Sequence, residues 1–147
     1  MRYYGYDEFL KDMKNLLKQV KPYRPEAIIA VARGGLAIGQ MLAEGLDLRT
    51  LYSINSIHYD GETKLDYIKI NNIPDLGCAK RVLVVDDIVD SGDTMREIVA
   101  ALKKEYPDVE FKVMTLFQKP TAAFKADFWR QESSEWIDFF WISDIRG

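Results

Sequence analysis

Three carboxylates and a short run of small polar residues lie together near the middle of the chain. Residues 82–94 have the sequence VLVVDDIVDSGDT, in which Asp86 and Asp87 end an apolar segment and Asp90 begins a loop. Gly92 allows a tight turn, so that consecutive backbone N–H groups point inward at the start of a following helix, where an anion such as phosphate is favoured. Carboxylates next to a phosphate would repel it unless they bind hydroxyl groups and Mg²⁺. The segment therefore predicts a site for a phosphorylated ligand with magnesium.

A second glycine loop, Arg33-Gly34-Gly35, follows a short apolar run at residues 27–32. Apolar runs of this length are typical of strands that are buried on both faces. The carboxyl ends of parallel strands meet at one edge of a sheet, so the arginine and the freed backbone amides should lie beside the acid loop. Taken alone, the loop is more typical of a glycine turn with a solvated arginine.

The elements that must position these loops alternate between strand and helix patterns, which predicts a single α/β domain over residues 1–147. Its mostly parallel twisted sheet should be flanked by helices on both faces and connected by right-handed crossovers. Apolar residues at helical spacing predict a first helix that begins at Asp7 as N-cap. Helices are expected at 7–20, 36–44 and from the acid loop to about 106, and strands at 27–32, 49–57, 64–70, 81–85, 111–117 and 139–142.

Composition excludes several classes of protein. With 48% hydrophobic and 29% charged residues the chain is globular rather than disordered or fibrous. The net charge of −3 gives no support for a nucleic-acid surface. A lone cysteine, Cys78, cannot form an internal disulfide. Neither a signal-peptide core nor a stretch of about 18 apolar residues occurs, so a cytoplasmic protein without a membrane span is expected.

The central segment resembles the signature for phosphoribosyl pyrophosphate (PRPP) of type I phosphoribosyltransferases. That signature has two acids, two apolar residues and then Asp-Ser-Gly-x-Thr after a hydrophobic strand, as residues 86–94 do. The resemblance implies that Asp86 and Asp87 face the ribose hydroxyls and a bound Mg²⁺. It also implies that the loop after these acids binds the 5′-phosphate. The first acid of that loop, Asp90, would be the catalytic residue near purine N7. The loop residues are Asp90, Ser91, Gly92, Asp93 and Thr94.

The match has two departures and two further consequences. Ser91 replaces the usual threonine but keeps a hydroxyl, and Asp93 is tolerable near a phosphate only if its side chain points to solvent. The resemblance assigns Arg33 and Gly34 to pyrophosphate binding, with a cis peptide bond between Ala32 and Arg33. It also implies a flexible flap over the active site at residues 56–69.

The C-terminal part resembles bacterial xanthine-guanine phosphoribosyltransferases, which are of similar length. Those enzymes have Lys-Pro after a strand and a tryptophan-isoleucine-acid segment near the end, as here at Lys119-Pro120 and Trp136-Ile137-Asp138. On this match residues 119–142 bind the base: Lys119 contacts O6, Trp136 stacks and the Ile137 backbone meets the purine edge. An aromatic face suits stacking, and an ammonium group selects a C6 carbonyl over an amino group. Packing is the alternative role for Trp136.

The resemblance implies a purine-salvage enzyme that transfers the phosphoribosyl group of PRPP to N9 of guanine, xanthine or hypoxanthine, as a homodimer or homotetramer. A response-regulator receiver domain also has a strand that ends in two acids, but that strand lies near the N-terminus, whereas here only about 60 residues follow Asp87. Two alternatives stay open. They are a non-catalytic PRPP-sensing regulator and a transferase for another acceptor base.

Overall fold

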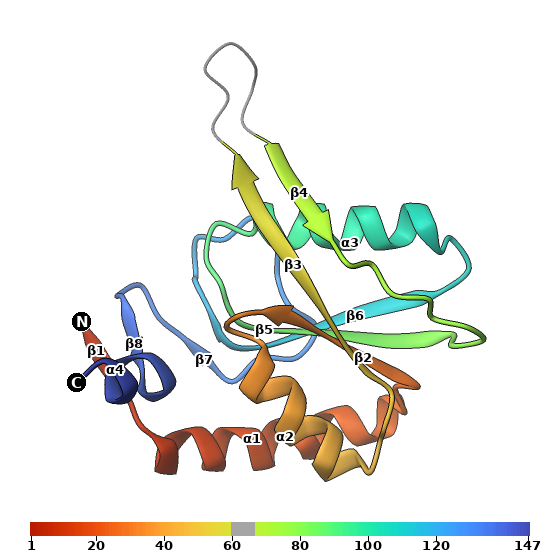
Figure 1. Cartoon of the computed structure of the whole chain (residues 1–147). Coiled ribbons are helices and arrows are strands. Elements are labelled where there is room, and N and C mark those ends of the chain that lie inside the picture. The colour runs from red at the N-terminus through yellow and green to blue at the C-terminus, as the bar shows by residue number, and fades with distance from the viewer. Residues whose placement is uncertain (60–66) are drawn as a thin grey trace.

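The computed structural model describes residues 1–59 and 67–147 and shows one central sheet with helices on both faces (Figure 1). In chain order the elements are β1 (Arg2–Tyr4), α1 (Tyr6–Val20), the 3-10 helix η1 (Lys21–Tyr23), β2 (Ala27–Ala32), α2 (Leu36–Leu46), β3 (Leu51–Tyr59), β4 (Tyr67–Asn71), β5 (Arg81–Val89), α3 (Asp93–Glu105), β6 (Glu110–Gln118), β7 (Gln131–Glu132), β8 (Ile137–Phe139) and α4 (Phe140–Arg146). Within the described residues no helix is long and apolar enough to cross a membrane.

The main sheet has the strand order β4-β3-β2-β5-β6-β7, in which only the β3–β4 pairing is antiparallel. Side chains alternate across its two faces. On β2, Ile28 and Ala30 pack in the core beneath α1 and α2, whereas Ala27, Ile29 and Val31 pack in the core beneath α3. Figure 1 shows α1 and α2 on one side of the sheet and α3 on the other. The predicted fold class is therefore confirmed.

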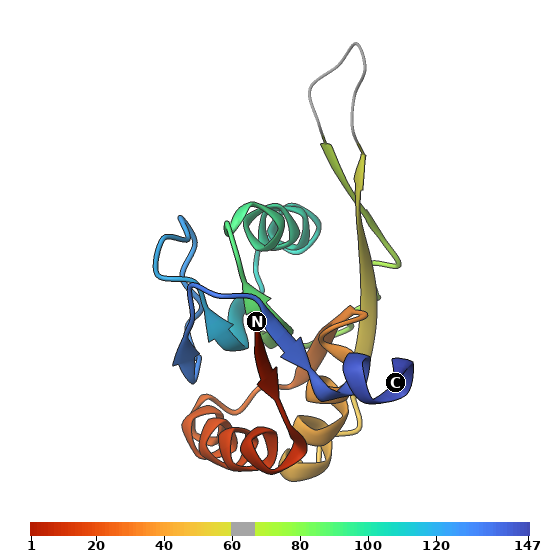
Figure 2. The same cartoon turned by 90° about the vertical axis from the view of Figure 1, so that its left-hand side faces the viewer.

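A second, two-stranded sheet joins the two ends of the chain, and the sequence patterns did not predict it. Strand β1 pairs in parallel with β8, with Arg2 opposite Ile137 and Tyr4 opposite Phe139. Figure 2 shows the two strands side by side near both termini. The segment that carries Trp136 and Ile137 thus depends on the N-terminal strand.

Two local predictions are wrong. Helix α1 begins at Tyr6 with Gly5 as N-cap, so Asp7 lies in the first turn instead of capping the helix. The predicted strand at 139–142 is wrong, because β8 ends at Phe139 and a helix follows. An apolar run this short does not distinguish a strand from a helix by its periodicity. In the structure Phe139 packs against Tyr4, and the helical turn brings Phe140 and Trp141 onto Phe9.

The predicted flap at 56–69 is only partly described. Its residues 56–59 belong to β3 and its residues 67–69 to β4, in adjacent antiparallel strands. Residues 60–66, the rest of the predicted flap, lie outside the described residues.

Candidate active site

Strand β5 carries the two adjacent acids to the carboxyl edge of the sheet, between β2 and β6. The side chains of Asp86 and Asp87 are partly buried, and their local hydrogen bonds come from the backbone. The N–H of Asp87 donates to Oδ1 of Asp86 at 2.8 Å, and the N–H of Ile88 donates to Oδ1 of Asp87 at 2.7 Å. Burial raises the pKa of Asp86 well above its ordinary value, and the charge of Asp87 adds to this rise.

Burial also raises the pKa of Asp87, although the hydrogen bonds that this carboxyl accepts oppose the rise. Two carboxyl groups with raised pKa values are short of positive charge. The pair is thus suited to hydroxyl donors and a divalent cation, and on this point the chemistry of the donor set fits Mg²⁺.

The acid loop follows at once and ends in a tight turn at Gly92, whose φ is +93°. A Cβ at this position would lie 2.6 Å from the backbone N of Phe124, so both conformation and space require glycine. Helix α3 begins at the next residue, and its N-cap, Gly92, has no side chain that could bond the first N–H groups of the helix. Its first turn therefore offers backbone N–H groups to an anion.

The extra acid of this loop, Asp93, points to solvent as the sequence argument requires. Its side chain is 72% exposed and lies 3.7 Å from Nη1 of Arg96, one turn further along α3. The neighbouring hydroxyl of Ser91 accepts the N–H of Asp93 at 3.2 Å. Asp93 is thus directed outward and has a basic neighbour on the same helix.

The loop Arg33-Gly34-Gly35, which follows β2, lies directly against β5, the strand that carries Asp86 and Asp87. A Cβ on Gly34 would be only 2.3 Å from Oδ2 of Asp87, and one on Gly35 only 2.4 Å from the carbonyl oxygen of Val85. The peptide bond between Ala32 and Arg33 is cis, which confirms the prediction for this bond. The two loops therefore meet at one edge of the sheet, as their positions after parallel strands predicted.

A cavity of about 580 Å³ opens between the acid strand and the C-terminal segment. Asp87, Asp90 and Lys119 line one side, and residues 133–139 line the other. Within it, Nζ of Lys119 lies 2.9 Å from Oδ1 of Asp90. The indole of Trp136 is 74% exposed, so packing in the core does not account for this side chain. The cavity thus combines a cation, an acid and an available aromatic face.

The comparisons with known proteins agree with this geometry. Residues 5–144 match the phosphoribosyl transferase domain family. The chain belongs to this family. It is 30% identical to the xanthine-guanine phosphoribosyltransferase of Cereibacter sphaeroides over an alignment that covers 93% of this chain and 84% of the relative.

Solved structures give the same result for this phosphoribosyltransferase. The xanthine-guanine-hypoxanthine phosphoribosyltransferase of Helicobacter pylori is 42% identical, with a TM-score of 0.92 over 99% of this chain and 96% of that one. The purine phosphoribosyltransferase of Pyrococcus horikoshii is 29% identical, with a TM-score of 0.85 over 95% and 92% of the two chains.

The structure places the predicted site residues in two groups. The cavity brings together Asp87, Asp90, Lys119, Trp136 and Ile137. The other predicted residues lie behind or beside it, on β5, on the loop and first turn of α3, and on the loop after β2; they are Asp86, Ser91, Gly92, Asp93, Thr94, Arg33 and Gly34. All of these residues lie around one edge of the sheet, and their roles toward a ligand stay predictions.

Sequence reasoning missed several residues of the site in this phosphoribosyltransferase. Met1 and Arg146 line the cavity because β1 and α4 lie beside the base segment. Phe124 packs against Gly92, and the N–H of Ala123 donates to the carbonyl of Ser91 at 3.0 Å. No signal in the sequence indicated these contacts, because each joins segments that are far apart in the chain.

Proposed function

We propose that the protein transfers the phosphoribosyl group of PRPP to N9 of a 6-oxopurine, giving the nucleoside 5′-monophosphate and pyrophosphate. The pair formed by Lys119 and Asp90, with 2.9 Å between its charged atoms in the cavity, carries this proposal. The names of the relatives, which act on xanthine, guanine or hypoxanthine, support it.

The pair matches one edge of a 6-oxopurine. Its O6 accepts hydrogen bonds and its N7, when protonated, donates them, so O6 suits the ammonium of Lys119 and N7–H suits the carboxylate of Asp90. Adenine instead presents an amino donor at C6, which would face the ammonium donor. A site built for one hydrogen-bonding pattern rejects the other because its polar groups are left unpaired. The pair thus favours guanine, xanthine and hypoxanthine over adenine.

The PRPP half would use the sheet edge. Asp86 and Asp87 would hold the ribose hydroxyls and Mg²⁺, and the loop from Asp90 to Thr94 would hold the 5′-phosphate. Carboxylate oxygens are the ligands that Mg²⁺ prefers in proteins, and these two acids would supply them. When bound, Mg²⁺ neutralises charge on the pyrophosphate.

Catalysis would be mainly positional and electrostatic. The bond between C1′ and pyrophosphate loosens, positive charge develops on the sugar ring, and N9 attacks C1′. Arg33 and the amides of its loop stabilise the leaving pyrophosphate. Asp90, placed beside the purine edge, accepts the N7 proton as the new bond forms.

One assay tests the proposal. PRPP and Mg²⁺ are incubated with guanine, xanthine, hypoxanthine, adenine and orotate, and the release of pyrophosphate is followed. Turnover with at least one 6-oxopurine and none with adenine is expected. Absence of turnover with every purine would refute the proposal, and PRPP binding without turnover would favour a PRPP-sensing regulator.

Four further expectations belong to this proposal. The chain acts as a single domain, residues 56–69 form a flap over the site, the enzyme is cytoplasmic, and it assembles as a homodimer or homotetramer. Light scattering on the purified protein measures the assembly. Protection of residues 56–69 from proteolysis by PRPP tests the flap.

A further inference from the structure

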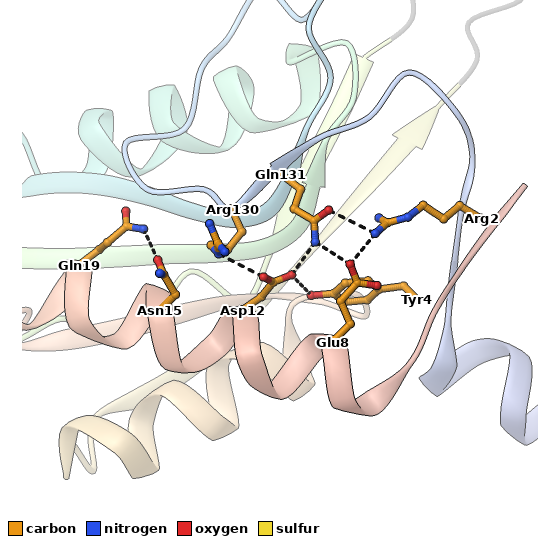
Figure 3. Close-up of polar contacts among 8 residues, drawn as sticks. All are labelled: Arg2, Tyr4, Glu8, Asp12, Asn15, Gln19, Arg130 and Gln131. Carbon is orange, nitrogen blue, oxygen red and sulfur yellow. Dashed lines mark hydrogen bonds and ion pairs between the residues drawn. The ribbon is translucent and has the colours of Figure 1, made fainter.

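A buried acid on helix α1 lies outside the catalytic machinery. The side chain of Asp12 is 3% exposed, yet it is fully paired. Its Oδ2 accepts the hydroxyl of Tyr4 at 2.6 Å and Nε2 of Gln131 at 2.8 Å, and its Oδ1 accepts Nε of Arg130 at 3.1 Å (Figure 3). A buried carboxylate is costly unless donors surround it, so this arrangement is specific.

The three donors come from two distant parts of the chain. Tyr4 belongs to β1, whereas Gln131 belongs to β7 and Arg130 precedes it. Arg2 and Glu8 extend the cluster, because both side chains also bond to the amide group of Gln131. Burial and the bond to Asp12 raise the pKa of Tyr4 far above its ordinary value, so its hydroxyl stays a donor over the physiological pH range.

These two parts of the chain are the anchors of the wall of the cavity. Strand β7 ends at Glu132, residues 133–139 line the cavity, and β8 within that stretch pairs with β1. The N–H of Arg2 also donates to the carbonyl of Trp136 at 3.0 Å. One carboxylate therefore ties the segment at its start through Gln131 and at its end through Tyr4.

We propose that Asp12 is a positioning residue for base binding: it fixes both ends of residues 133–139 and so sets where Trp136 and Ile137 meet the purine. The inference rests on the proposed function for the identity of the ligand. The acid loop has a separate support, since β5, α3 and the contact between Gly92 and Phe124 hold it. Loss of the contacts that Asp12 makes with Tyr4 and Gln131 should therefore weaken the binding of the base and leave the binding of PRPP intact.

The test compares the variant Asp12→Asn with Tyr4→Phe. Asparagine keeps the shape but places an amino donor opposite donors, and phenylalanine removes only the hydroxyl. An unpaired buried donor costs a free energy that corresponds to about a tenfold change in an equilibrium constant, here the one for binding of the base. We expect the KM for guanine to rise about tenfold in Asp12→Asn and less in Tyr4→Phe, with the KM for PRPP within about twofold of wild type.

Two controls separate positioning from lost stability. Asp7→Asn makes the same chemical change at an exposed position of α1 and should leave both KM values unchanged. Val20→Ala weakens the buried end of the same helix, away from the cavity, and should lower thermal stability without a selective rise in the KM for guanine. Equal changes in both KM values, or an unchanged KM for guanine, would overturn the proposal.

A second measurement does not depend on turnover. Amide hydrogen exchange should speed up at residues 133–139 in Tyr4→Phe and stay unchanged at residues 90–95. Unchanged exchange at 133–139 would also overturn the proposal. If the wild type shows no transferase activity, the proposed function fails, whereas exchange still decides whether Asp12 holds the segment. If Asp12→Asn does not fold, Tyr4→Phe carries both tests.

Discussion

Substitution of Gly34 by alanine should damage activity while leaving the fold nearly intact. The new Cβ would lie 2.3 Å from Oδ2 and 2.6 Å from Cγ of Asp87, whereas real contacts of this kind begin at about 3.0 Å. Asp87 or the loop must therefore move by at least about 0.7 Å, the difference between 3.0 and 2.3 Å. A side-chain carboxyl can turn away at little cost in stability. A displacement of about 1 Å near the reacting atoms can cost about 100-fold in rate, so we expect kcat/KM for PRPP to fall roughly 10- to 100-fold.

Alanine substitutions at two other glycines serve as comparisons for Gly34→Ala. In Gly35→Ala the Cβ would lie 2.4 Å from the carbonyl oxygen of Val85 and 2.9 Å from the backbone of Val31. Because the central sheet itself would have to shift, the free energy of unfolding should fall by about 3 kcal/mol or more. In Gly77→Ala the Cβ would meet nothing within 4 Å, so the positive φ of +56° should cost about 1 kcal/mol of stability while the kinetics stay those of the wild type. Pyrophosphate release and urea unfolding measure both quantities, and a Gly34→Ala enzyme with kcat/KM within twofold of wild type would refute the reasoning.

Three further predictions concern single side chains of the site. Asp90→Asn should lower kcat about 10²- to 10⁴-fold with little change in the KM for PRPP, because it removes a proton acceptor; equal turnover would exclude that role. Lys119→Gln should lower kcat/KM for guanine about 10- to 100-fold and reduce the discrimination against adenine, and a base panel measures both. Asp86→Asn should abolish most turnover yet raise the melting temperature of the metal-free protein by about 2–4 °C, since it removes a buried charge beside Asp87. Because the pKa of Asp86 is raised, the folded state binds more protons than the unfolded state, so the stability of the wild type falls as the pH rises from about 4 through the raised pKa. In Asp86→Asn this fall should be flatter, which calorimetry at several pH values measures.

The PRPP half could be predicted from sequence because its parts are contiguous. Strand β5, the acids and the loop before α3 occupy one uninterrupted stretch, and strand β2 with its glycine loop occupies another. Each stretch has a local signal: an apolar run, a glycine where φ is positive, and a helix pattern with its buried stripe. Their meeting follows from the parallel sheet alone. Even the outward direction of Asp93 followed from charge repulsion.

The base half was less predictable because distant segments build it. Lys119 and Trp136 were identified, but nothing in the first four residues indicated that β1 would pair with β8. Helix α1 was predicted from its apolar stripe, and that same pattern hid Asp12, which occupies a buried position as an acid. Two of its three partners are 118 and 119 residues further along the chain, and no periodicity encodes such contacts.

This division has a consequence for how the enzyme would change its base preference. The PRPP half packs glycines and carboxylates so tightly that Gly34, Gly35 and Gly92 have no room for a methyl group. By contrast, residues 133–139 form a short segment whose two ends are held by the polar cluster around Asp12, and Trp136 between these ends is largely exposed. A substitution in the polar cluster around Asp12 would therefore shift residues 133–139 without a clash among the residues proposed to bind PRPP. We accordingly expect base selectivity to respond to changes at Tyr4 and Gln131, which are far from the reacting atoms in sequence, more readily than PRPP use does.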